Sequence, residues 1–291
     1  MSQPADIPIV TKLRKDEMYR VVVKPQGMCT TRDVSSNTHP SLEGQDAMLI
    51  ASRCGKVVGK RAKYKKASPV HRLDAGTGGL VICSENKTME SILKRYFQDH
   101  LVKKRYRCVV VGKVEDDEGI IDHPLKGKDS QTKYKVVSCV ENEKYTHLTT
   151  LDCFPVQGRR HQIRKHMQVL GHPIVNDHRY GSKLDDKEDW PPWQFLWAME
   201  VQFPDPYIAL KTWLSTSNKE GTSNGDDDDE ELSLRFVDKA HKVLDDVDMA
   251  SIPLITVTTE EPEYFEEFRQ QKKRKCESEQ VETEKKRQKA E

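Results

Sequence analysis

Short apolar runs bounded by turn residues constrain this chain most, because they predict a fold rich in β-strands. β-branched and other apolar residues gather in five such runs, at residues 19–23, 80–83, 107–111, 134–140 and 146–154. Pro25 and Gly27 follow the first run and Gly112 follows the third, and these residue types are typical of turns. The sequence therefore predicts five strands separated by turns and longer connections.

Two segments between these runs predict helices. The first follows Ser84 and Asn86, either of which can cap a helix. Its apolar residues recur at helical spacing: Met89, Ile92, Leu93, Tyr96, Phe97 and Leu101. The second covers about residues 160–170, carries Ile163, Met167 and Leu170 on one face, and ends before Gly171. We interpret both apolar stripes as packing surfaces.

The charge of the chain is divided unevenly along its length. Residues 1–214 carry 35 basic and 26 acidic side chains, whereas residues 215–291 carry 13 and 21, so the net charges are +9 and −8. A basic body indicates a polyanionic partner. The mean hydropathy of −0.78 with 33% charged residues indicates a soluble core joined to disordered segments. No apolar run of about 18 residues occurs, so we expect no contact with a membrane.

The composition changes after Trp213, where a Ser/Asn/Gly-rich stretch precedes an acidic run at residues 226–231. We therefore predict an extension over residues 1–17, a domain over 18–214, and a charged, mostly disordered tail over 215–291 with a short helix within it. Basic clusters at 272–275 and 285–287 resemble a bipartite nuclear-import signal, although many solvated tails contain such clusters. The expected location is the nucleus or the cytoplasm.

Other features exclude several kinds of site. The seven cysteines form no C-x-x-C pair and their number is odd, which indicates reduced thiols, so we expect neither zinc nor disulfides. The first twenty residues lack the apolar segment of a secretory signal. A basic run at residues 53–66 suits either phosphate contacts or a solvated loop. No cofactor and no metal ion is expected.

Short polar motifs stand at strand ends and helix starts. Residues 71–79 read H-R-L-D-A-G-T-G-G, residues 158–164 read G-R-R-H-Q-I-R, and residues 171–181 contain G-H-P-I-V-N-D and Y-G. Lys24-Pro25-x-Gly27 and Lys104-x-Tyr106 complete the set. Together and in this order, the motifs resemble those of the RluA-type pseudouridine synthases over about residues 18–214.

The chain departs from the family's motifs at three positions. Gly78 stands where serine is usual, Arg160 replaces threonine, and Asn176 replaces glycine. Losing the serine hydroxyl removes one hydrogen bond, and Arg160 adds positive charge. Neither change deletes a catalytic group, so the resemblance implies an active enzyme.

The resemblance implies a fold and a reaction. The fold is α+β, with a mixed, largely antiparallel sheet, flanking helices and a central catalytic cleft. The reaction isomerises uridine in RNA to pseudouridine. One rival is an inactive RNA-binding module on the same fold, which would need none of Asp74, Tyr106 and Arg164. A hydrolytic glycosidase is the other rival, and it normally requires a second carboxylate.

The resemblance also assigns roles to individual residues. Asp74 is the catalytic carboxylate, Arg164 its expected ion-pair partner, and Tyr106 the aromatic ring that stacks on the flipped uracil. Arg72 fills the place that the uridine vacates, and Ile163 packs against the base.

The remaining expectations concern substrate contacts and partners. Lys104 and Arg160 are expected to bind the substrate. The partner is RNA, either tRNA, rRNA or another RNA, and the chain is expected to act as a monomer. His161 and His166 are spaced wrongly to share a metal on one helix face, so we expect structural roles for them.

Overall fold

The computed structural model describes residues 9–11, 19–30, 68–84, 87–181, 192–217 and 243–270. It divides the chain into two compact units, the first made of residues 1–105 and 198–259 and the second of residues 106–197 and 260–291. The basic run at 53–66, the acidic run at 226–231 and the clusters at 272–275 and 285–287 lie outside the described residues.

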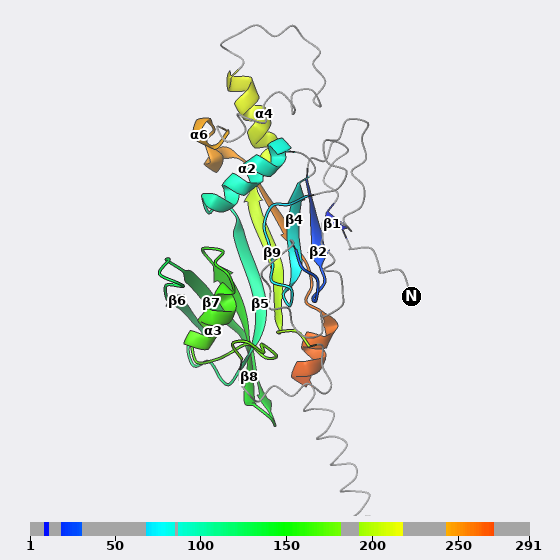
Figure 1. The fold of residues 1–291 in the computed structure, drawn as a ribbon, viewed down its shortest axis with the longest axis vertical. Coiled ribbons are helices and arrows are strands. Elements are labelled where there is room, and N and C mark those ends of the chain that lie inside the picture. Colours follow the sequence, from blue (N-terminus) through cyan, green and yellow to red (C-terminus); the bar gives the residue numbers. More distant parts are fainter. Residues whose placement is uncertain are drawn as a thin grey trace, which may run out of the picture. The chain divides into compact units, whose positions relative to one another are not determined.

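The first unit contains strands in the order β1-β2-β4-β9, with β10 paired to β9 and β3 paired to β4 (Figure 1). Their bounds are β1 Ile9–Thr11, β2 Tyr19–Lys24, β3 Ser68–Pro69, β4 Gly78–Ser84, β9 Leu196–Pro204 and β10 Leu254–Thr258. The first two residues of β9 belong to the second unit. Antiparallel pairing joins β1 to β2, β2 to β4, β3 to β4 and β9 to β10.

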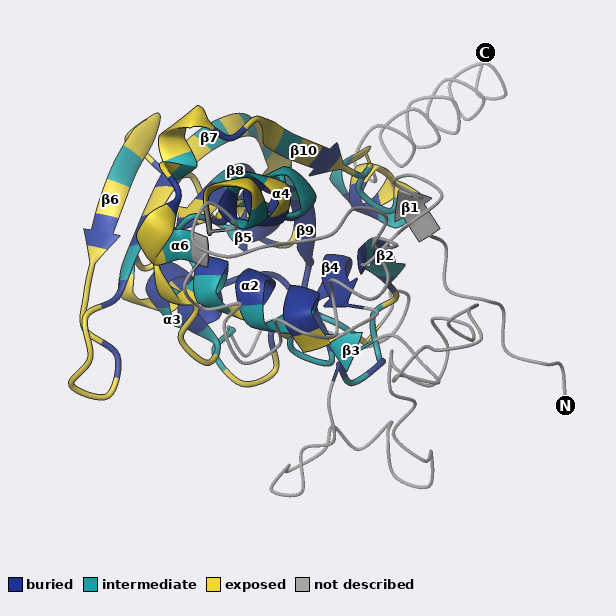
Figure 2. Cartoon of the chain, turned by 90° about the horizontal axis from the view of Figure 1, so that it is seen from above, coloured by how far each residue is buried: buried dark blue, intermediate teal, exposed yellow. Residues whose placement is uncertain are grey.

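β4 is the most deeply buried strand of the first unit, because every one of its seven residues is buried (Figure 2). Helices α2 (Lys87–Gln98) and α4 (Pro206–Ser217) belong to the same unit. The apolar stripe predicted on α2 packs into its core, where Met89, Ile92, Leu93 and Tyr96 are fully buried with Phe203 of β9. The helical spacing of the apolar residues of α2 is therefore explained by their packing in the core, as expected.

The second unit is built on four antiparallel strands in the order β5-β8-β7-β6. Their bounds are β5 Lys103–Val111, β6 Glu118–Asp122, β7 Gln131–Asn142 and β8 Thr146–Pro155. Helix α3 (Gln162–Val169) lies against β7 and β8. His166 of α3 is buried and bonds the Thr132 hydroxyl at 2.8 Å and the His123 carbonyl at 3.1 Å, which confirms its structural role.

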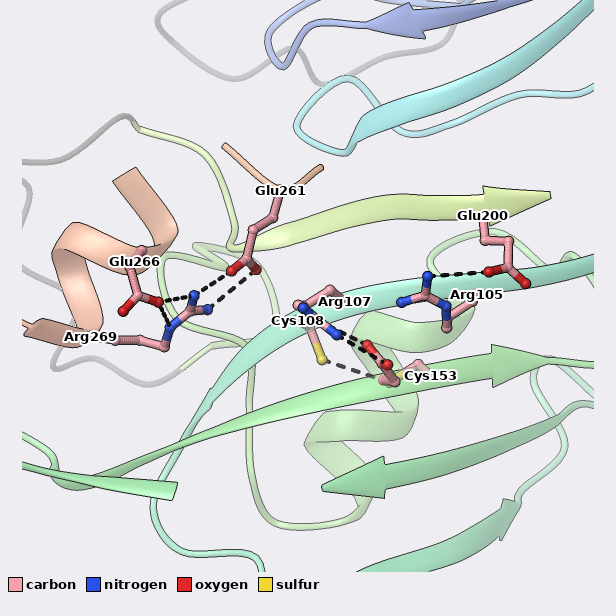
Figure 3. A network of polar contacts seen from close by, with 9 residues as sticks. Arg105, Arg107, Cys108, Cys153, Glu200, Glu261, Glu266 and Arg269 are labelled. Atoms are coloured by element: carbon pink, nitrogen blue, oxygen red, sulfur yellow. Dashed lines mark hydrogen bonds and ion pairs between the residues drawn. The ribbon is translucent and has the colours of Figure 1, made fainter. Parts of the chain in front are cut away.

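Polar contacts connect neighbouring strands of the second unit (Figure 3). Arg107 of β5 forms an ion pair with Asp152 of β8, with 2.9 Å between Nε and Oδ1. The Cys108 and Cys153 thiols meet between the same two strands at 3.7 Å, and both are fully buried. Tyr106, Cys153 and Tyr134 follow one another across β5, β8 and β7 in register.

The described residues after 214 contribute to both units, with 243–259 in the first and 260–270 in the second. The mostly disordered tail that the composition indicates stays a prediction. In the first unit, α6 (Val243–Asp246) and the 3-10 turn Met249–Ser251 lead into β10, which pairs with β9 from Leu254 to Thr258. In the second unit, a helix at residues 263–270 packs Phe265 and Phe268 on Phe195. These segments pack into the units because they contain apolar residues within an otherwise charged stretch of sequence. The predicted domain boundaries themselves stay predictions.

The five predicted strands and both predicted helices are present, and the α+β class with a largely antiparallel sheet is confirmed. β6, β9, β10 and α4 were not predicted. β6 was missed because its sequence, Glu-Gly-Ile-Ile-Asp, has two apolar residues and mostly exposed positions. Within the described part of the chain, no helix has both the length and the apolar character needed to cross a membrane.

We predict that Gly79→Ala lowers the free energy of unfolding by about 3 kcal/mol or more. Gly79 has a φ of +107°, and a Cβ there would lie 2.3 Å from the Ala198 carbonyl oxygen, a backbone atom that cannot move aside. Gly127→Ala is the matched control, because its φ is +70° with no atom within 4 Å of the new Cβ, so only about 1–2 kcal/mol of backbone strain is expected. Urea unfolding followed by circular dichroism measures both losses, and equal losses would contradict the steric argument.

Candidate active site

The segment that carries Asp74 runs from β3 to β4 and is fixed at both ends. The Ile82 amide donates to His71 Nε2 at 2.9 Å, and the His71 ring stacks on Phe97 with 4.6 Å between centroids. The Thr77 amide donates to the Asp74 carbonyl at 3.0 Å and closes a turn directly after the carboxylate. Asp74 itself is half-buried, so its carboxylate retains access to a substrate.

The loop after β2 holds the same segment from the other side. Thr30 Oγ1 donates to the Leu73 carbonyl at 3.0 Å and accepts from the Leu73 amide at 3.1 Å. The Gly27 amide donates to the Ala75 carbonyl at 2.8 Å, and Gln26 Nε2 donates to Gly76 at 2.8 Å. The backbone is therefore fixed on both sides of Asp74. We call this set of bonds between residues 24–30 and 71–76 the loop clamp.

Lys24 is the buried centre of the loop clamp. Its ammonium donates to the carbonyls of Met28 at 2.8 Å, Pro25 at 3.0 Å and Ala75 at 3.2 Å, and the side chain is fully buried. Burial lowers the pKa of Lys24 to about 7, and the nearby Asp74 carboxylate opposes that shift. Three carbonyl acceptors favour the ammonium form, because a neutral amine has only two hydrogens to donate.

Two further predicted residues share the first unit with Asp74. Arg72 is exposed. Lys104, near the start of β5, is half-buried, and burial lowers its pKa to about 8. Its positive charge also contributes to lowering the pKa of His71, so Lys104 lies close to the segment that carries Asp74.

The other predicted residues belong to the second unit. Tyr106 is half-buried on β5, Ile163 is buried on α3, and Arg160 is exposed before α3. Arg164 forms a bidentate ion pair with Asp177, with 2.6 Å from Nε to Oδ2 and 2.8 Å from Nη2 to Oδ1. Asp74 is the partner that the sequence motifs predict for Arg164, and that pairing stays a prediction.

Asp177 has a role that the sequence motifs did not predict. Its side chain is fully buried, and Oδ1 also accepts the amides of Arg179 and Tyr180, each at 3.1 Å. The carboxylate thereby orders the chain after it while holding the Arg164 guanidinium. Its position in the G-H-P-I-x-x-D motif could have marked Asp177 as a candidate site residue. The motif alone does not identify the cation that the carboxylate binds.

The described residues contain no group of three or more histidine, cysteine, aspartate or glutamate side chains arranged to hold a metal ion. The first unit presents a carboxylate and an ammonium, and the second unit presents a phenol and a guanidinium; such groups suit nucleophilic attack, charge stabilisation and proton transfer.

We predict that Lys24→Met lowers the free energy of unfolding by at least about 2 kcal/mol, because the buried carbonyls lose their donor. Lys94→Met is the control, since Lys94 is exposed and pairs only with Glu90 one helical turn away, so a change below about 0.5 kcal/mol is expected. Chemical denaturation of both variants gives the two values. A Lys24→Met loss as small as the control would show that the loop clamp does not depend on the ammonium.

We predict that His71 makes stability depend on pH below neutrality. Burial, with a smaller contribution from Lys104, lowers the pKa of His71 to about 3, whereas an unfolded histidine has a pKa of about 6.5. The unfolded chain therefore binds the proton first, so the contribution of His71 is complete above about pH 6.5 and is lost progressively toward pH 3. The difference in unfolding free energy between the wild type and His71→Asn should shrink as pH falls from 7 to 4, since other titrations cancel.

Comparison with known proteins agrees with this geometry. The model of the RNA pseudouridylate synthase family matches residues 18–169. The dual-specificity RNA pseudouridine synthase RluA of Vibrio parahaemolyticus is 41% identical over 184 residues, covering 58% of this chain and 68% of the relative. The protein of the same name from Pasteurella multocida is 29% identical over 229 residues, covering 74% and 94%.

A solved structure supports the fold. Human RNA pseudouridylate synthase domain containing 1 superposes with a TM-score of 0.52 at 19% identity, covering 77% of this chain and 100% of that one. On the sequence matches and this fold, the chain belongs to the RluA-type family of RNA pseudouridine synthases, isomerases that act on uridine in RNA.

Proposed function

We propose that this chain converts specific uridines in RNA to pseudouridine with Asp74 as the essential carboxylate. The observation that carries the proposal is the loop clamp, which fixes the backbone on both sides of Asp74 and buries the Lys24 ammonium near its carboxylate. A surface aspartate in an ordinary turn needs no such support. The clamp therefore indicates a carboxylate whose position matters.

The reaction explains why a fixed carboxylate is needed. Pseudouridine forms when the bond between ribose C1′ and uracil N1 breaks and C1′ rejoins the same uracil at C5; C5 then loses its proton and N1 gains one. No electrons are gained or lost overall. Asp74 acts as nucleophile or stabilises the charge that develops during cleavage. Lys24 places a buried positive charge near this carboxylate.

The second unit supplies the groups expected to act on the base. The fork between Arg164 and Asp177 uses Nε and Nη2. We propose that Asp74 is a further carboxylate partner of the same guanidinium, and that Arg164 orients it beside the flipped uridine. Tyr106 stacks on the uracil and assists proton transfer, and Ile163 packs against the ring.

We assign substrate positioning to the remaining predicted residues. Arg72, which is exposed, enters the base stack that the uridine leaves and offsets the cost of flipping, a few kcal/mol. Lys104 and Arg160 contact the RNA backbone. We propose a structured RNA such as tRNA or rRNA as the substrate, a monomer as the active form, and the nucleus or cytoplasm as the location. Pseudouridine mapping in cells with and without the protein identifies the substrate.

We predict that Asp74→Asn abolishes pseudouridine formation while the variant folds and binds RNA. Asparagine keeps the size of the side chain but cannot act as an anionic nucleophile, so the rate should fall by at least about a thousandfold, or roughly 4 kcal/mol in the barrier. Carbodiimide mapping of RNA from cells that express each form measures the product.

Asp116→Asn is the control, because Asp116 is an exposed carboxylate in the second unit, and it should retain full activity. Normal pseudouridine formation by Asp74→Asn would overturn the assignment. Wild-type protein that binds RNA but forms no pseudouridine would instead favour the inactive binding module.

A further inference from the structure

The ring of Tyr180 gathers three cationic side chains of the second unit. Arg164 Cζ lies 5.1 Å from the ring centroid, Arg179 Cζ 5.7 Å, and Lys165 Nζ 5.9 Å. The Tyr180 hydroxyl is held 3.0 Å from His161 Nδ1, with the two rings edge to face. The ring is therefore fixed from one side, and positive charge is concentrated around it.

A hairpin brings a fourth cation near Lys165. Lys126 is exposed at the tip of a turn that the Leu125 and Lys128 backbones close, and both Lys126 and Gly127 have positive φ angles of 55° and 70°. The loop is tied to α3 by bonds from Gln162 to the Gln131 carbonyl and from His166 to the His123 carbonyl. These bonds fix the hairpin beside the helix.

The cations act on one another electrostatically. Burial first, and then the charges of Lys126, Arg179, Arg160 and Arg164 in that order, lower the pKa of Lys165. The Asp177 carboxylate is occupied by Arg164 with both of its oxygens. Like charges held together raise the energy of the folded chain unless an anion binds. We call Lys126, Arg160, Arg164, Lys165 and Arg179 the Tyr180 cation cluster.

We propose that Lys126, Lys165 and Arg179 of the Tyr180 cation cluster bind the sugar–phosphate backbone of the substrate RNA, as a docking site distinct from the residues that act on the uridine. The inference rests on the proposed function and deepens it by naming a surface that holds the RNA. Arg179 presents a fork that matches a phosphate, and the two lysines offer point charges. Phosphates recur along an RNA strand, so one backbone segment can meet several of these cations.

The roles proposed for the active-site residues do not account for the positive charges of Lys126, Lys165 and Arg179. Lys165 directly follows the G-R-R-H-Q-I-R motif, Lys126 lies on the hairpin, and Arg179 occupies a position between the motif residues Asp177 and Tyr180. Lys126 and Arg179 are exposed and Lys165 is half-buried, so the three side chains are accessible to an extended polyanion.

The test compares two triple variants of the full chain that change the net charge equally. Lys126→Gln/Lys165→Gln/Arg179→Gln removes the proposed contacts. Lys94→Gln/Lys113→Gln/Lys144→Gln removes three exposed lysines elsewhere, two of which pair with nearby glutamates. Fluorescence anisotropy measures the Kd of each protein for a uridine-containing RNA hairpin of ~20 nucleotides between ~50 and ~200 mM salt. Thermal melting shows that each variant is folded.

The expected result is specific to the cluster. Its variant should bind at least about tenfold more weakly, and the slope of log Kd against log salt should fall by about two, since each lost phosphate contact removes ~0.7 from the slope. The control variant should stay within about twofold of the wild type. A third variant, Lys126→Arg/Lys165→Arg/Arg179→Lys, keeps the positive charge at all three positions. It should therefore retain most of the affinity that the glutamine variant of the cluster loses. Equal losses in both glutamine variants overturn the docking site, because net charge alone would then explain them.

Pseudouridine formation, measured separately, distinguishes failure of the docking site from failure of the proposed function. Wild-type protein that forms pseudouridine while the two glutamine variants bind RNA alike contradicts the docking site alone. Wild-type protein that forms none, with affinity lost only in the cluster variant, contradicts the proposed function and supports the docking site.

Discussion

The buried Lys24 ammonium is the interaction on which the active-site loop depends. Removing a charge from water costs several kcal/mol unless other groups replace the solvent. Here three backbone carbonyls do so, and one of them belongs to Ala75, directly after Asp74. The same ammonium thus orders the backbone next to Asp74 and places a positive charge near its carboxylate.

Local patterns were enough to find five of the strands and the motif that carries Asp74. The runs around Val21, Val81 and Val109 are apolar because their strands are buried, and a buried strand has a recognisable composition. The motif at residues 71–79 is informative for a different reason. Its glycines accompany a sharp change of backbone direction, and Gly79 in particular packs against the β9 backbone at Ala198.

Pairings between distant residues could not be predicted in this way. Thr30 bonds the backbone of Leu73, 43 residues later in the chain, and nothing near Thr30 marks it as a clamp. Asp177 belongs to a recognisable motif, but its binding to Arg164 required the geometry. β10 was overlooked because its five residues lie between charged stretches and form a strand through pairing with β9. Tertiary contacts decide such cases more than intrinsic preference does.

The division of the chain into units has a consequence for its synthesis. The main segment of the second unit, residues 106–197, is continuous, whereas the first unit needs residues from both 1–105 and 198–259. A ribosome therefore releases nearly all of the second unit while β4, with Gly79 still uncovered, awaits β9. All seven residues of β4 are buried in the folded chain, so their exposure during translation leaves the nascent chain open to chaperones and to aggregation.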